Sequence, residues 1–332
     1  MPVSQHKSIE SLWYGNSTSK WLLLPLAWIY GLIVFFRRSL YTSGLLTRPQ
    51  LPVPVIVVGN IAVGGTGKTP VVAWLAQQLH AAGYRPGIVS RGYGGSHSGA
   101  AVLVNEQSDA AIVGDEPLML AQITACPVCI CTDRVAAVEM IAQQGVNVVI
   151  TDDGLQHYRL RRSFEIVVVD GQRGFGNGQL LPAGPLRENL QRIGQADAVL
   201  INGGSELIEG TEFNLISGDL HSVSGNQTKS LNDFHGQRVW GLAGIGNPGR
   251  FYSMLIDAGL EVDRVDVNDH GKHSLASLVA LRDQPVLMTQ KDAVKYHSSV
   301  PQNAWYLPVE VQFAEADATK LMQLIGDQLA EA

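Results

Sequence analysis

The sequence has few charged residues and no excess of positive charge. Charged residues make up 16% of its 332 residues, and the formal net charge is −6. Proteins that bind nucleic acids normally present a basic surface, so this composition argues against nucleic acid as a partner. At this length the chain can form one large domain or two moderate domains, each with a sizeable core.

Cysteine is also scarce. The chain has three cysteines, Cys126, Cys129 and Cys131, within the short segment CPVCIC. The C-x-x-C spacing would suit a metal or redox site, but no fourth ligand lies nearby in the sequence and there is no even-numbered set for disulfides. Free cysteines are usually core residues. We therefore expect reduced thiols on a buried strand, with Cys129 and Cys131 on one face.

One long apolar run, residues 21–36 (WLLLPLAWIYGLIVFF), lies between Lys20 and the pair Arg37-Arg38. A helix of this length would extend about 24 Å, less than the ~30 Å hydrocarbon core of a bilayer. No small-residue cleavage site follows, so we do not expect a removable signal peptide. Aromatic residues are abundant around the run and favour a helix that lies in the membrane surface. The alternatives are a helix packed on the protein's own core and a true transmembrane span.

From residue 53 onward, apolar strand-like runs alternate with helical patterns. Unbroken apolar runs of this kind suit strands buried on both faces of a parallel sheet, which predicts an α/β fold with helices on both sides. A polar stretch at 203–237 is followed by a second α/β pattern. We predict a region with a membrane-associated helix (1–50), a main α/β domain (51–230) and a smaller C-terminal α/β domain (231–332).

The segment VGNIAVGGTGKTP (58–70) follows a predicted strand and opens a predicted helix. It resembles the phosphate-binding signature G-x-x-x-x-G-K-[ST], except that Ala62 stands where the opening glycine is expected. That replacement matters only if the position needs a positive φ. The loop predicts a nucleoside triphosphate site with Mg²⁺ on the Thr69 hydroxyl and the phosphates on Lys68 and the main-chain N–H groups. The candidate nucleotide-binding residues are Gly64, Gly65, Thr66, Gly67, Lys68 and Thr69.

Two further motifs follow predicted strands. Asp152 and Asp153 end the run VVITDD, where P-loop enzymes hold an acid that binds Mg²⁺. The segment GIGNPG (244–249) matches G-x-G-x-x-G, with Asp263 and Asp266 downstream as candidate ribose-binding acids. It leaves open a second interpretation, an enzyme with an additional dinucleotide site, although the motif is weak alone.

Seven ordered blocks resemble the tetraacyldisaccharide 4'-kinase (lipid A 4'-kinase) family of Gram-negative bacteria. They run nearly the length of the chain: PVPVIVVGNIAVGGTGKTPVV, GIVSRGYGG, GDEPLMLA, TDDGLQHYRL, IVVVDGQRGFGNGQLLPAGPLRE, VNDHGKHSL and MTQKDAVKY. The family's loop has the form GN-x-x-x-GG-x-GKTP, which Ala62 fits. The family's usual T-E-K-D reads T-Q-K-D here, with Gln290 in place of the acid and with Lys291 and Asp292 retained.

The resemblance implies ATP- and Mg²⁺-dependent phosphorylation of the 4'-hydroxyl of a tetraacyl glucosamine disaccharide 1-phosphate in lipid A biosynthesis. It further implies an enzyme at the cytoplasmic face of the bacterial inner membrane, peripheral or monotopic, with no obligate protein partner. Residues 51–230 would then be a P-loop kinase domain whose active site is completed by residues 231–332. Two alternatives stay open: a P-loop NTPase that acts as a switch or metallochaperone, and a soluble small-molecule kinase.

The resemblance also suggests residue roles. Asp115 corresponds to the candidate general base, and His270 to its partner. Arg187 is the first candidate for the γ-phosphate, beside Lys68, and Arg91 and Arg134 come next. The expected metal ligands are Thr69, Asp152, Asp153 and Glu188. A further group would meet the acceptor's 1-phosphate or anionic lipid heads, unless it is a solvated charge run: Arg159, Arg161 and Arg162.

Overall fold

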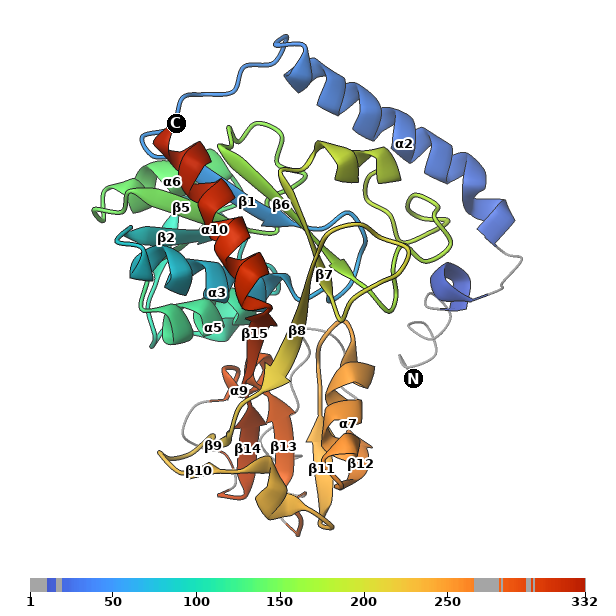
Figure 1. The fold of residues 1–332 in the computed structure, drawn as a ribbon, viewed down its shortest axis with the longest axis vertical. Helices are drawn as coiled ribbons and strands as arrows, with labels where there is room; N and C mark the ends of the chain where they lie inside the picture. Colours follow the sequence, from blue (N-terminus) through green and yellow to red (C-terminus); the bar gives the residue numbers. More distant parts are fainter. Residues whose placement is uncertain are drawn as a thin grey trace.

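The computed structural model describes residues 11–15, 20–265, 281, 283–296, 300 and 302–331. The described chain forms a large nine-stranded sheet and a smaller six-stranded sheet, which we call the large unit and the small unit. In Figure 1 the small unit lies below the large one, and a long helix, α2 (Lys20–Thr42), runs along the top of the large unit.

The large sheet is parallel except at its two edges, where β3 and β15 run antiparallel to their neighbours. Its strand order is β15-β8-β7-β6-β1-β5-β2-β4-β3. Every residue of β1, β2, β5 and β6 is buried, as the apolar runs in the sequence predict. The strands are β1 (Val55–Gly59), β2 (Pro86–Ser90), β3 (Val102–Val104), β4 (Val128–Ile130), β5 (Val148–Asp152), β6 (Phe164–Asp170), β7 (Ala198–Asn202), β8 (Thr211–Ser217) and β15 (Val309–Phe313).

Helices cover both faces of the large sheet. Residues of α3 (Lys68–Ala81), α5 (Asp115–Thr124) and α10 (Glu315–Ala330) share one apolar cluster with Ile56 and Val58 of β1. Residues of α6 (Arg134–Ala142) share the opposite cluster with Val55 and Val57. Successive strand residues point to opposite faces, so β1 contributes to both cores. The short elements α4 (Ala110–Val113) and η1 (Leu190–Gln195) complete this unit. The predicted layered α/β fold is confirmed.

The small sheet has the order β10-β9-β14-β13-β11-β12. Its core is formed by the apolar face of α7, which buries Phe251, Tyr252 and Leu255. The elements are β9 (Leu220–Ser222), β10 (Thr228–Lys229), η2 (Leu231–Phe234), β11 (Arg238–Leu242), α7 (Pro248–Asp257), β12 (Glu261–Val265), β13 (Val286–Thr289), α9 (Gln290–Ala293) and β14 (Ala304–Leu307).

The division between the units differs from the predicted boundary at residue 230. The small unit already begins at β9, and the chain returns to the large sheet after β14, where β15 pairs with β8. The helix α10 then buries Leu321, Ile325 and Leu329 in the core of the large unit. The polar stretch 203–237 contains three strands, β8, β9 and β10. The physical reason that β8 reads as a linker is that it is only partly buried, with an irregular pattern of exposed positions.

The cysteines lie where the burial interpretation predicts. Cys129 in β4 and Cys131 just after it are buried in the same apolar cluster, and the Cys129 Sγ atom lies 3.8 Å from the Met140 Sδ atom. Cys126 is half-buried. Burial raises the pKa of the Cys129 thiol to about 11, which keeps it protonated and a poor metal ligand.

The helix α2 spans Lys20–Thr42 and includes Pro25. At 23 residues it extends about 34 Å, so the 24 Å estimate from the apolar run alone was too short. Of the described helices, α2 is long and apolar enough to cross a membrane, by length and composition only. Ala27 is its only buried residue, so the protein's own core covers little of the apolar surface of α2.

Candidate active site

The P-loop joins the carboxyl end of β1 to the first turn of α3. Gly64 and Gly67 have positive φ values, 129° and 96°, which suit glycine. Ala62 is not among the non-glycine residues with positive φ in the described chain. It instead forms an antiparallel bridge with Leu186 and is buried. The missing opening glycine therefore costs nothing, because the backbone at position 62 does not need glycine.

Buried amide side chains hold the loop in place. Asn60, fully buried, donates weakly to the Gly64 main-chain oxygen at 3.4 Å. Asn202, at the carboxyl end of β7, donates to the Thr66 main-chain oxygen at 3.1 Å. A Cβ atom at Gly67 would lie 2.7 Å from the Asn202 amide nitrogen, so this close approach requires glycine as well. Neither amide was predicted from the sequence, although each follows directly on an apolar strand run.

The carboxylates of Asp152 and Asp153 lie beside the loop, because β5 pairs with β1 and brings Asp152 opposite Val58. Thr69 Oγ1 donates to Asp152 Oδ2 at 3.3 Å, and Lys68 Nζ lies 3.8 Å from Asp153 Oδ1. Asp153 has a φ of 55°, an uncommon conformation for a residue other than glycine. Such backbone conformations concentrate at functional sites.

The Thr69–Asp152 pair fits a divalent cation. Asp152 is buried, and its Oδ1 atom has no hydrogen-bond partner. Burial, followed by the nearby Glu116 carboxylate, raises the pKa of Asp152 to about 7. A cation on this carboxylate would offset both effects. Within the described residues no group of three or more His, Cys, Asp or Glu side chains could hold a metal ion. Mg²⁺ here would therefore need phosphate and water ligands, which it commonly retains.

Arg187 and Glu188 lie on the segment that pairs with the start of the P-loop. Arg187 Nη1 donates to both Asp153 carboxylate oxygens, at 2.9 and 3.0 Å. Gln156 connects the two neighbours, since its amide oxygen accepts from Arg187 and its amide nitrogen donates to Glu188. Glu188 is buried and lies 3.5 Å from Arg192. The structure thus brings Arg187 to the carboxylate pair, while Glu188 faces Gln156 and Arg192.

Two more predicted arginines follow neighbouring strands. Arg134 begins α6, is buried, and donates to the Cys131 main-chain oxygen at 2.8 Å. Burial lowers the pKa of Arg134 to about 10, while the nearby Asp153 and Asp152 carboxylates favour its charged form. Arg91 follows β2 and is exposed. Both lie at the carboxyl edge of the sheet, the usual ligand-binding edge of an open α/β fold.

The candidate base Asp115 is the first residue of α5 and is buried, with 4% of its surface exposed. It follows Gly114, where a Cβ atom would lie 2.7 Å from the Tyr93 main-chain oxygen. Asp115 Oδ1 accepts from the main-chain N–H of Glu116 at 3.0 Å. Its Oδ2 lies 3.5 Å from Lys295 Nζ of the small unit. Its predicted partner His270, and Asp266 of the dinucleotide interpretation, lie outside the described residues.

The segment GIGNPG forms the loop between β11 and α7, as its motif predicts, but it faces the P-loop. A Cβ atom at Gly246 would lie 2.6 Å from the Gly65 main-chain nitrogen. Arg173 Nη1 donates to the Gly246 main-chain oxygen at 3.1 Å. Asp263, the candidate ribose ligand, is paired with Arg238 at 2.8 Å. The loop therefore joins the two units at the P-loop.

The three arginines at 159–162 have different surroundings. Arg162 is paired with Glu165 at 2.6 Å and also donates to the main-chain oxygens of Leu155 and His157. Arg159 is paired with Asp133 at 2.6 Å, and Arg161 is exposed. Arg162 thus stabilises its own segment, whereas Arg159 and Arg161 remain at the surface.

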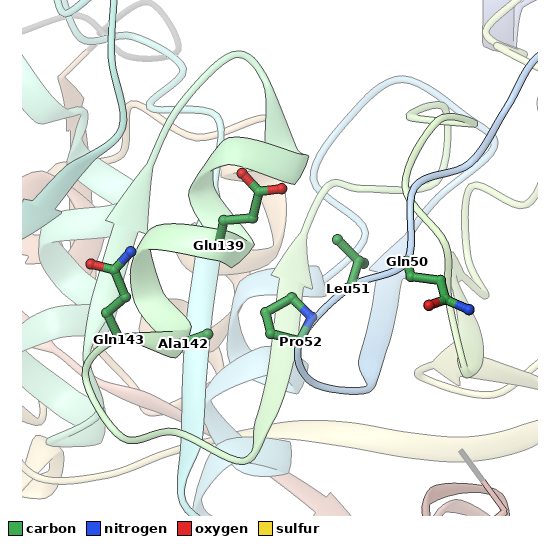
Figure 2. A pocket seen from close by; sticks show the side chains of 6 residues that line it. All are labelled: Gln50, Leu51, Pro52, Glu139, Ala142 and Gln143. Atoms are coloured by element: carbon green, nitrogen blue, oxygen red, sulfur yellow. The ribbon is translucent and has the colours of Figure 1, made fainter.

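An open pocket of about 630 Å³ lies away from this site, between α6 and the segment that leads into β1. Figure 2 shows its lining side chains, which include Leu51, Pro52 and Glu139. Leu51 and Pro52 precede β1, whereas the P-loop follows it, so the pocket lies at the opposite end of the sheet. The candidate active site is instead at the P-loop, where glycines, carboxylates and positively charged side chains lie together.

In this chain a glycine loop joins a buried strand to a helix that begins with Lys68 and Thr69, and an acid lies on a neighbouring parallel strand. These features define the P-loop class of nucleotide-binding α/β proteins. Within that class, residues 19–329 match the sequence profile of the tetraacyldisaccharide-1-P 4'-kinase (LpxK) family. The chain belongs to this family, and is a kinase of lipid A biosynthesis.

Individual relatives agree with the profile. The chain is 47% identical to the tetraacyldisaccharide 4'-kinase of Alkalilimnicola ehrlichii, over 90% of each chain. It is 44% identical to that of Tolumonas auensis, over 95% of this chain and 96% of the relative. Among solved structures it resembles LpxK from Aquifex aeolicus in complex with ATP, with a TM-score of 0.79 and 29% identity, over 93% of this chain and 99% of that one. These findings confirm the resemblance and the fold class expected from the sequence.

Proposed function

We propose that the chain transfers the γ-phosphate of ATP to the 4'-hydroxyl of a tetraacyl disaccharide 1-phosphate, with Mg²⁺, at the cytoplasmic face of the bacterial inner membrane. The proposal rests on one combined observation. A chain of this family has a P-loop, a buried Asp152 carboxylate with an oxygen that lacks a hydrogen-bond partner, and an exposed apolar helix. The ATP complex of the Aquifex aeolicus relative supports the choice of nucleotide.

On the phosphate side, the reaction needs charge stabilisation more than covalent chemistry. The main-chain N–H groups of Gly64–Thr69 and the amino end of α3 would hold the β- and γ-phosphates. Lys68 and Arg187 both contact Asp153, and they would supply the positive charge that faces the γ-phosphate. Arg134 and Arg91 would add positive charge from the neighbouring strands.

Mg²⁺ would bind at Thr69 Oγ1 and Asp152, where the unpartnered carboxylate oxygen supports a cation site. A bound Mg²⁺ would supply electrostatic stabilisation of the charge on the phosphate oxygens. Asp153, held by Arg187, and Glu188, the residue after Arg187, would supply further negative charge around the metal. The proposed metal environment therefore comprises Thr69, Asp152, Asp153 and Glu188.

On the acceptor side, the 4'-hydroxyl is a weak nucleophile that gains from a positioned base. We propose that the Asp115 carboxylate accepts the hydroxyl proton while the hydroxyl oxygen bonds to the γ-phosphorus and ADP leaves. The resemblance assigns His270 as the partner of Asp115. Phosphate, metal and base would then approach the acceptor from the P-loop, β5 and α5 respectively.

The lipid acceptor stays in the bilayer, so the enzyme must dock on it. One side of α2 rests on the large unit, where Tyr30 donates to the Arg187 main-chain oxygen at 3.1 Å. The other side is apolar and exposed, with Trp28 at 66% and Phe36 at 61%. A helix that is supported along one side by its own protein and apolar on the other suits a position in the membrane surface. These two sides of α2 support a monotopic enzyme, in which α2 lies in the membrane surface, rather than a transmembrane helix.

The direct test measures transfer of labelled γ-phosphate from ATP to tetraacyl disaccharide 1-phosphate in mixed micelles with Mg²⁺. We expect label on the lipid, a loss of at least about 10²-fold in Lys68→Ala, and a loss of about 10²- to 10⁴-fold in Asp115→Asn. Binding of ATP should survive in Asp115→Asn, because that residue faces the acceptor. Hydrolysis of ATP without labelling of the lipid would contradict the proposed acceptor.

A further inference from the structure

A lysine of the small unit lies buried against the candidate base. Lys295 has 7% of its surface exposed, and its Nζ atom lies 2.8 Å from Asp292 Oδ1 and 3.5 Å from Asp115 Oδ2. Asp292 belongs to α9 of the small unit, whereas Asp115 begins α5 of the large unit. A buried ammonium group is tolerated only where opposite charges and hydrogen bonds surround it. This ion pair is therefore a fixed link between the two units.

Asp292 keeps Lys295 from moving. It is 1% exposed, and its second oxygen, Oδ2, accepts from Thr289 Oγ1 at 2.6 Å and from the Gly244 main-chain N–H at 2.8 Å. Its carboxylate is thus held on three sides by its own unit. The position of the Lys295 ammonium is set by this framework rather than by solvent, so it presents a defined charge to Asp115.

The same framework reaches the phosphate site. Gly244 opens the loop 244–249, and Gly246 in that loop lies against Gly65 of the P-loop. Arg173 of the large unit donates a hydrogen bond from Nη1 to the Gly246 main-chain oxygen at 3.1 Å. One set of contacts in the small unit therefore touches both the loop that would hold the phosphates and the carboxylate that would accept the proton.

We infer that Lys295 is a positioning residue for Asp115, which sets the place of this carboxylate relative to the P-loop. The inference rests on the proposed role of Asp115 as general base. Asp115 Oδ1 accepts a hydrogen bond from the Glu116 main-chain N–H and Oδ2 faces Lys295, so both carboxylate oxygens have a partner on the protein. Orientation of this kind contributes strongly to rate when reacting atoms must be aligned.

The chain offers a matched control one turn earlier. Lys291 in α9 also pairs with α5, since its Nζ atom lies 3.0 Å from Glu116 Oε1. This second ion pair joins the same two units but is more exposed, with 13% and 28% of the two side chains accessible. Lys291→Met removes a link between the units without removing a partner of Asp115, whereas Lys295→Met removes the partner.

The test is a double-mutant cycle on lipid phosphorylation, with kcat, the KM values for ATP and lipid, ATP affinity and Tm measured for each variant. We expect Lys295→Met to lower kcat by about 10- to 100-fold with the KM for ATP within about 3-fold, and Lys291→Met to keep kcat within about 3-fold. In the Asp115→Asn background, Lys295→Met should cause no further loss, because its effect acts through that carboxylate.

Equal kcat losses from Lys295→Met in both backgrounds, or an equal loss in Lys291→Met, would overturn the inference in favour of a purely structural link. If Lys295→Met does not fold, Lys295→Arg enters the same cycle. It shifts the positive charge relative to Asp115, with an expected loss of about 3- to 10-fold only where Asp115 is present. Full activity of Asp115→Asn would overturn the proposed base and this inference together. Impaired Asp115→Asn with unimpaired Lys295 variants would overturn the inference alone.

Discussion

The adjacent residues Asp152 and Asp153 are the same amino acid, but the structure shifts their pKa values in opposite directions. Burial raises the pKa of Asp152 to about 7. Burial would also raise the pKa of Asp153, but the positive charges of Lys68 and Arg187 bring it below its ordinary value. Asp152 therefore gains most from a bound cation, while Asp153 is already neutralised by side chains of the protein. No property of the sequence VVITDD distinguishes them, because the difference arises from which neighbours the fold supplies.

His157 gives a prediction about pH and stability. Burial, and then the nearby Arg134 guanidinium, lower its pKa from 6.5 to about 4. Because the folded pKa is the lower one, the unfolded chain takes up a proton first as the pH falls. The stabilisation from a neutral His157 is thus fully present above pH 6.5 and is lost toward pH 4. From pH 7 to pH 4.5 we expect this residue alone to lower the free energy of unfolding by about 2 kcal/mol.

The measurement is urea unfolding of the wild type and His157→Gln across that pH range. Carboxylates also titrate in this range, so the informative quantity is the difference between the two proteins at each pH. We expect His157→Gln to be less stable at pH 7 and the gap to narrow as the pH falls. A gap that stays constant with pH would show that His157 is not held neutral by its surroundings.

At the scale of single elements, the sequence predicts structure that depends on neighbouring residues along the chain. The segment from β1 through the P-loop to α3 was predictable because an apolar run, glycines and a helical spacing each lie within a few residues. The strand β8 was missed because its positions are only partly buried, and composition alone reads it as a polar linker. The length of α2 was underestimated because its polar ends, Lys20 and Arg37–Thr42, continue the helix beyond the apolar run.

The exposed side of α2 leads to a prediction about membrane binding. Ile29 and Ile33 are 56% and 61% exposed and lie one turn apart on this side. Replacing both with serine removes apolar surface from the outer side without disturbing the contact that Tyr30 makes on the inner side. We expect weaker binding to anionic phospholipid vesicles, by about 10-fold or more, because the transfer of two such side chains contributes several kcal/mol.

Flotation of the purified protein with vesicles measures this, and Leu207→Ser is the matched control. Leu207 is 95% exposed, but it belongs to the segment between β7 and β8 and not to α2. We expect Leu207→Ser to float like the wild type. If the double serine variant also floats like the wild type, α2 does not contribute the membrane contact. Unfolding of the double variant, checked by circular dichroism, would show instead that this side of α2 packs on protein.

At the scale of the whole molecule, the candidate site combines residues that lie far apart in the sequence. The P-loop and the Asp152–Asp153 pair were predictable, because motifs mark both. The contact of Lys295 with Asp115 was not, because it depends on how the small unit sits on α5. The contact of Gly246 with Gly65 likewise could not be predicted, since the motif GIGNPG alone suggests a separate dinucleotide site. Motifs reveal local chemistry, whereas contacts between units follow from tertiary packing.

The return of the chain to the large sheet leads to a prediction about truncation. In Figure 1, α10 and β15 lie on the large unit, above the strands of the small unit. Removal of residues 309–332 deletes the edge partner of β8 and three buried side chains of the large core, those of Leu321, Ile325 and Leu329. Each buried aliphatic side chain contributes about 2 kcal/mol, so the loss approaches the whole stability of an ordinary domain. We expect the truncated protein to lose cooperative unfolding and ATP binding.

Circular dichroism melting curves and ATP affinity test this against a variant that lacks only residues 331–332, which follow α10 and should behave like the wild type. If residues 231–332 formed a separate domain, the longer truncation would damage only that domain and leave a folded, ATP-binding P-loop domain. The two architectures thus predict opposite results for one protein. A melting transition that persists with intact ATP affinity would restore the boundary at residue 230. Its loss would place the last strand and helix in the core that supports the P-loop.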